Sequence, residues 1–101
     1  MNHKLLDAVI VDTTGTGIVH QGGAFTIQIQ SSSFGGGTVK IQGSLDGTNY
    51  VSLPTAPDNS TLAEYTANTM VRGILNQSTY IRAVLTGSTT PAALTVTYCN
   101  N

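Results

Sequence analysis

The stretch AFTIQIQS, residues 24–31, decides the fold class of this chain. Its apolar residues Phe25, Ile27 and Ile29 alternate with threonine and glutamine. A period of two is typical of an antiparallel strand that buries one face and leaves the other in water. The stretch therefore predicts a half-buried strand.

Similar runs lie on both sides of this stretch. Further strands are predicted at LLDAVIVD (5–12), TVKIQGSL (38–45), NYVSL (49–53), TMVRGI (69–74), YIRAVLTG (80–87) and ALTVTY (93–98). Segments rich in Gly, Pro, Asn and Ser separate these runs and favour turns. Seven to eight short strands at this spacing predict an all-β fold, either a β-sandwich or a small barrel. Of the two, we expect an antiparallel β-sandwich of the jelly-roll or Ig-like kind.

One segment has a competing interpretation. In TLAEYTAN, residues 61–68, Thr61 and Glu64 have the spacing of a capping box, which opens a helix. The β-branched residues that follow favour no more than two helical turns.

The inward positions of the alternating runs predict the hydrophobic core. Its members are Phe25, Ile27, Ile29, Val39, Ile41, Leu45, Ile81, Leu94 and Val96.

The composition narrows the function classes. Charged residues make up 9% of the 101-residue chain, against about 25% in an ordinary domain, and the formal net charge is −1. Four basic residues provide no cationic surface for phosphates, so no nucleic-acid partner is expected. The apolar runs are too short to span a bilayer, and the N-terminus lacks the features of a signal peptide. We expect a protein made in the cytoplasm, without a membrane partner.

The stretch GSLDGTNY, residues 43–50, has two possible interpretations: a loop that binds an ion or a sugar, or a turn between two strands. Asp46 and Gly47 suit a hairpin, because glycine adopts the positive φ that tight turns require. A calcium loop would need several converging oxygen ligands, whereas this stretch offers Asp46 and Asn49. The pattern favours the hairpin.

No constellation of residues predicts an enzyme. His3 and His20 lack the spacing of zinc ligands, and His20 is interpreted as a polar loop residue. The single Cys99 has no partner for an internal disulfide. We therefore expect no catalytic residue, no cofactor and no metal.

Three motifs together resemble a β-sandwich domain of small tailed-phage virion proteins. That domain carries a "G-S-x-D-G-T-x-aromatic" hairpin, an "A-N-G-x-Y-R" strand, and an "aromatic-Ile/Val-Arg" strand before a closing strand. The matching residues are Gly43, Ser44, Asp46, Gly47, Thr48, Tyr50, Ala67, Asn68, Arg72, Tyr80, Ile81, Arg82, Leu94, Val96 and Tyr98. Thr69 and Met70 stand where the family has Gly and a variable residue, and the resemblance covers about residues 24–99.

The resemblance implies a non-enzymatic structural protein of a phage virion. We expect a capsid decoration (cement) protein that binds the major capsid protein or another virion protein and stabilises the capsid. Head-fibre and tail roles remain open. Such proteins assemble symmetrically, and a homotrimer is expected.

A carbohydrate-binding module is the alternative. Discoidin-like domains carry a similar turn, and a neutral surface rich in Thr, Asn and Gln suits sugar hydroxyls. A phage adhesin domain belongs to the same alternative. In this interpretation Tyr50 or Tyr65 would contact a glycan.

The N-terminal segment, residues 1–23, lies outside the resemblance, which leaves residues 24–101 as the sandwich domain. The apolar residues of the N-terminal segment either form a strand of the same sandwich or pair with a neighbouring subunit, since few charges protect the strand edges. The candidate partner-binding residues are Leu5, Leu6, Val9 and Ile10.

Overall fold

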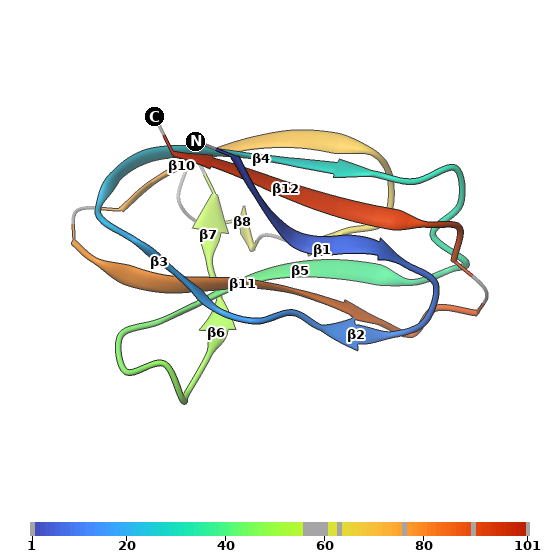
Figure 1. The fold of residues 1–101 in the computed structure, drawn as a ribbon, viewed down its shortest axis with the longest axis horizontal. Helices are drawn as coiled ribbons and strands as arrows, with labels where there is room; N and C mark the ends of the chain where they lie inside the picture. Colours follow the sequence, from blue (N-terminus) through green and yellow to red (C-terminus); the bar gives the residue numbers. More distant parts are fainter. Residues whose placement is uncertain (1, 56–60, 63, 76, 90, 101) are drawn as a thin grey trace.

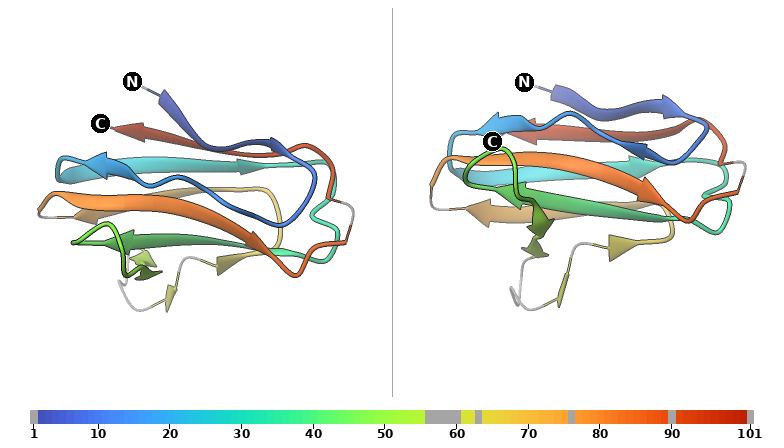
Figure 2. Two further views of the ribbon diagram at one scale, coloured as in Figure 1. Left: turned by 60° about the horizontal axis from the view of Figure 1, so that its bottom comes forward. Right: turned by 90° about the horizontal axis from the view of Figure 1, so that it is seen from below.

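The computed structural model describes residues 2–55, 61–62, 64–75, 77–89 and 91–100. Two antiparallel sheets pack face to face as a β-sandwich (Figures 1 and 2). The apolar side chains of the alternating strands fill the space between the sheets. The predicted fold class is confirmed.

The four-stranded sheet brings the two ends of the chain together. Its order is β1 (Asn2–Val9), β12 (Leu94–Asn100), β4 (Gly23–Gln30) and β10 (Thr69–Leu75). Every neighbouring pair in it is antiparallel.

The second sheet is built around two long strands, β11 (Thr79–Thr86) and β5 (Thr38–Ser44). Shorter strands extend it on both sides: β2 (Thr13–Thr14) and β3 (Ile18–His20) pair with β11, and β6 (Val51–Ser52) and β9 (Glu64–Tyr65) pair with β5. A separate ladder joins β7 (Pro54–Thr55) to β8 (Thr61–Leu62).

The helix considered for residues 61–68 is wrong where the structure describes that segment. Strands β8 and β9 occupy 61–62 and 64–65. Both make antiparallel ladders, and Tyr65 packs against the core. Tertiary packing thus overrides the capping-box signal.

The core follows the predicted alternation with one error. Eight of the nine predicted members are buried, and Leu45 is 69% exposed. β5 ends at Ser44, so Leu45 is the first residue of the loop that follows and no longer obeys the strand period.

The N-terminal strand β1 buries two consecutive leucines. Lys4 pairs with Thr97 and Leu6 pairs with Val96, so two steps along β1 match one step along β12. This bulge places both Leu5 and Leu6 in the core, which strict alternation forbids. The strands before residue 24 lie in both sheets, so residue 23 does not mark a boundary between layers.

Candidate functional site: the Asp46 hairpin and the hollow beside it

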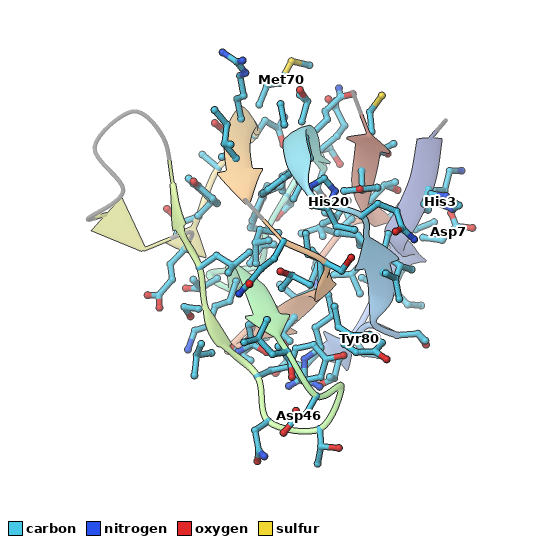
Figure 3. The ribbon with its side chains drawn as sticks, turned by 90° about the vertical axis from the view of Figure 1, so that its left-hand side faces the viewer. His3, Asp7, His20, Asp46, Met70 and Tyr80 are labelled. Carbon is cyan, nitrogen blue, oxygen red and sulfur yellow. The ribbon has the colours of Figure 1, made fainter. Side chains whose placement is uncertain are left out.

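The loop between β5 and β6 is organised by one carboxylate. Asp46 Oδ1 accepts hydrogen bonds from the Ser44 hydroxyl at 2.7 Å and from the backbone N–H groups of Thr48 and Asn49 at 2.8 and 2.9 Å. Asp46 Oδ2 accepts a fourth from Asn49 Nδ2 at 3.0 Å. Figure 3 shows Asp46 in this projecting loop.

These bonds change the acidity of the carboxyl group. The Asn49 N–H, then the Ser44 hydroxyl and the Thr48 N–H, hold the pKa of Asp46 well below its ordinary value of 3.8. The Ser44 hydroxyl in turn accepts the Gly47 N–H at 2.9 Å, and Gly47 has a φ of +76°. The predicted hairpin is confirmed, and its carboxylate serves to fold the loop.

The aromatic residue that ends this loop is held from two sides. The guanidinium Cζ of Arg82 lies 3.9 Å from the centroid of the Tyr50 ring, and Arg82 Nε donates to Gln42 Oε1 at 2.9 Å. The Tyr50 hydroxyl lies so close to Gly17 that a β-carbon at Gly17 would clash. Tyr50 and Arg82, which both carry the family resemblance, therefore stabilise each other.

A hollow of about 460 Å³ opens beside this hairpin. It lies where the loop after β5, the start of β6, the end of β10 and the start of β11 converge. Its lining residues are Gly43, Ser44, Leu45, Asn49, Val51, Leu53, Ile74, Gln77 and Thr79. None of these residues is charged.

Three aliphatic side chains at the hollow stand largely in water. Leu45 is 69%, Val51 68% and Ile74 54% exposed. Leu53 is buried behind them, and a β-carbon at Gly43 would come within 2.6 Å of Leu53 Cδ2. The absence of a side chain at Gly43 therefore makes room for Leu53.

Three polar side chains of the lining, those of Ser44, Asn49 and Thr79, have partners within the chain. Ser44 and Asn49 bond Asp46, and the Thr79 hydroxyl donates to the Gln77 carbonyl at 3.0 Å. These bonds leave an aliphatic rim as the main recognition feature of the hollow. This site could not be predicted from the sequence, because its apolar residues come from separate elements that only the fold brings together.

The interpretation of His20 as a polar loop residue is wrong. His20 ends β3, is fully buried, and lies between the layers (Figure 3). Its Nε2 is 3.0 Å from the Gly23 carbonyl, an obligatory acceptor, so Nε2 carries the proton and Nδ1 accepts from the Tyr98 hydroxyl. Burial, and then the neighbouring Cys99, raise the pKa of Tyr98. The pair satisfies two polar groups inside the core.

The predicted partner-binding residues divide into two groups. Leu5 and Leu6 are buried within this chain, Val9 is half-buried, and Ile10 is 65% exposed. Val11, which follows Ile10, is 63% exposed. Of the four candidates, Ile10 is therefore the most accessible to a partner.

A second aspartate fixes the backbone next to these exposed residues. Asp12 accepts hydrogen bonds from the Gly87 N–H at 3.1 Å, the Ser88 N–H at 2.9 Å and the Ser88 hydroxyl. The Ser88 hydroxyl is the main reason that the pKa of Asp12 is lowered from 3.8. We call residues 10–12 the corner, because they connect β1 of one sheet to β2 of the other.

Across the residues that the structure describes, no group of three or more His, Cys, Asp or Glu side chains could hold a metal ion. Within the same residues, no helix has the length and hydropathy needed to cross a membrane.

Comparisons with known proteins found no match for the chain. No protein-family model, no curated protein and no solved structure matches it.

Proposed function

We propose that this protein is a non-enzymatic structural protein of a phage virion, which decorates the capsid surface and stabilises it. The observation that carries this proposal is the chemistry of the hollow. The Ser44, Asn49 and Thr79 side chains of its lining are hydrogen-bonded within the chain, while three exposed aliphatic side chains surround it. Exposed apolar clusters with a polar border are typical of protein-contact surfaces.

The resemblance supplies the biological setting. Its residues Ser44, Asp46, Tyr50 and Arg82 stabilise the hairpin and its connection to the sheet. This structural use agrees with a family that carries no catalytic residue. A surface with few charges also suits a module that packs against other proteins in an assembly.

The carbohydrate-binding alternative finds less support in the tyrosines on which it depends. Sugar rings stack on exposed aromatic faces, and Arg82 covers a face of Tyr50. Tyr65 packs against the core. We therefore retain glycan binding only as an outcome of the test.

Binding to virions tests the proposal. The purified protein is mixed with virions that lack it and sedimented, and the temperature at which the capsids release DNA is measured with and without the protein. Saturable co-sedimentation together with a higher release temperature is expected. Absence of binding to virions, combined with selective binding on a glycan array, would overturn the proposal in favour of the carbohydrate-binding module.

A further inference from the structure

The corner and the hollow lie at opposite ends of the sandwich. Strand β11 begins at Thr79, which lines the hollow, and leads into Gly87 and Ser88, which hold Asp12 of the corner. Its eight residues span about 25 Å at the usual rise of a strand. Figure 1 shows the β1–β2 connection at one end of the long axis and the β10–β11 connection at the other.

The two ends have complementary shapes and chemistry. The hollow is concave, uncharged and rimmed by the aliphatic side chains of Leu45, Val51 and Ile74. The corner presents two adjacent aliphatic side chains, Ile10 and Val11, with more than half of each in water. A volume of about 460 Å³ lies in the range of pockets that hold small molecules, so there is room for such side chains.

We propose that the hollow of one copy of this chain receives Ile10 and Val11 of a second copy. The corner enters with its backbone already ordered, because Asp12 binds Gly87 and Ser88 and the Thr13 hydroxyl donates to the Val11 carbonyl at 2.9 Å. Pre-ordering lowers the entropy cost of association. The Asp12 carboxylate is engaged by its own chain, so its charge need not enter the partner's hollow.

The arrangement limits the symmetry of the assembly. The contact joins two different surfaces, so a two-fold dimer can form it only if each copy places its corner in the hollow of the other at the same time; in any other arrangement the contact is heterologous. Repetition of this contact closes a ring if the rotation permits and otherwise continues as a filament. A trimer, the state expected for the proposed virion protein, requires a contact of this kind. A formal net charge of −1 opposes self-association only weakly.

Single substitutions test both halves of the contact. Ile10→Asp places a charge on the corner, and Val51→Asp places one on the rim of the hollow. Light scattering after size-exclusion chromatography should show that the wild-type protein assembles, and that each variant needs at least a tenfold higher protein concentration to do so. Met70→Asp is the matched control, because Met70 on β10 is 67% exposed and lies in neither surface. Met70→Asp should assemble like the wild type.

A mixture of the two variants distinguishes a contact between the corner of one copy and the hollow of another from a contact of either surface with itself. The Ile10→Asp chain keeps an intact hollow and the Val51→Asp chain keeps an intact corner, so an equimolar mixture can form one good contact and no more. The expected product is a dimer with the mass of one chain of each variant. Circular dichroism verifies folding, and Ile10→Ser with Val51→Ser replaces the pair if either aspartate variant unfolds.

Three results would overturn the inference. They are a wild-type protein that stays monomeric at every concentration, an equal loss of assembly in Met70→Asp, and a mixture of variants that rebuilds the wild-type species. The inference rests on the proposed structural role only for its biological meaning. Assembly is measured without virions, so failure of this contact and failure of capsid binding are separate results.

Discussion

Asp46 and Asp12 organise opposite ends of the sandwich by the same chemistry, but their hydrogen-bond donors come from different distances along the chain. All donors to Asp46 lie within three residues of it. The donors to Asp12 lie 75 and 76 residues away. The Asp46 carboxylate therefore shapes one loop, whereas the Asp12 carboxylate ties two distant loops together.

This difference has a consequence for local stability. A turn held by its own residues can open while the strands beside it remain paired. A contact between distant loops is lost when either connection moves away, and its loss frees residues in both loops. We expect the corner to respond to mutation over a wider region than the hairpin does.

The largest loss of stability is expected from a substitution in the core, which lies between the two ends of the sandwich. Ile41→Ala should lower the free energy of unfolding by about 2–4 kcal/mol, because it leaves a cavity among fully buried neighbours. Leu45→Ala, one residue beyond the end of the same strand, should change it by less than about 0.5 kcal/mol, because Leu45 is exposed. Urea denaturation measures both, and equal losses would show that Leu45 belongs to the core after all.

Removal of the aspartates should give the next largest effects. Asp12→Ala should speed amide hydrogen exchange at Gly87 and Ser88 by about tenfold, as expected for the loss of an ordinary hydrogen bond, and should also speed exchange in the corner. Asp46→Ala should speed exchange at Thr48 and Asn49 alone.

Mass spectrometry of exchanged peptides shows how far along the chain amide exchange speeds up in each variant. A rise in exchange at residues 10–12 in Asp46→Ala would contradict the expectation that Asp46 acts only on its own loop. Equal and purely local responses in the two variants would show that the corner is held by other contacts.

The smallest effect is expected from acid, which should reduce the stability that Asp12 and Asp46 contribute at the two ends of the sandwich. The pKa of each aspartate is lowered in the folded protein from an ordinary value of 3.8. The unfolded chain therefore binds protons first as the pH falls, and the stability that these carboxylates contribute is complete above about pH 4 and lost below it.

Melting temperatures at pH 7, 5 and 3 measure this effect. Little change is expected between pH 7 and 5, followed by a decrease at pH 3. Asp46→Asn, which removes the titrating group, should show a smaller decrease than the wild type between pH 5 and 3. An unchanged decrease in this variant and in Asp12→Asn would assign the acid sensitivity to other carboxyl groups.

The strands could be predicted because their signal is local. Phe25, Ile27 and Ile29 alternate within one strand, and all three are buried. The same rule failed at Leu45, because alternation in the sequence does not show where a ladder ends. It also cannot show that a bulge buries Leu5 and Leu6 together.

The site was less accessible to sequence reasoning. The Asp46 hairpin follows from an Asp-Gly pair between two strands. The hollow depends on Val51 and Ile74. These residues belong to strands of different sheets, β6 and β10, so only the packing of the two sheets brings them to the same hollow. His20 was misassigned for the same reason, because its partner Tyr98 lies 78 residues away.

The ladder between β1 and β12 has a consequence for how this protein reaches its fold. Asn2 pairs with Cys99, so closing this ladder brings together residues almost a hundred positions apart. The entropy of the intervening chain must be overcome before Leu5 and Leu6 gain their packing energy. Domains dominated by such distant pairing fold in milliseconds to seconds, at the slow end of the range for small proteins. Until this ladder closes, Leu5 and Leu6 of β1 stay exposed to other copies, so dilute conditions should favour productive refolding.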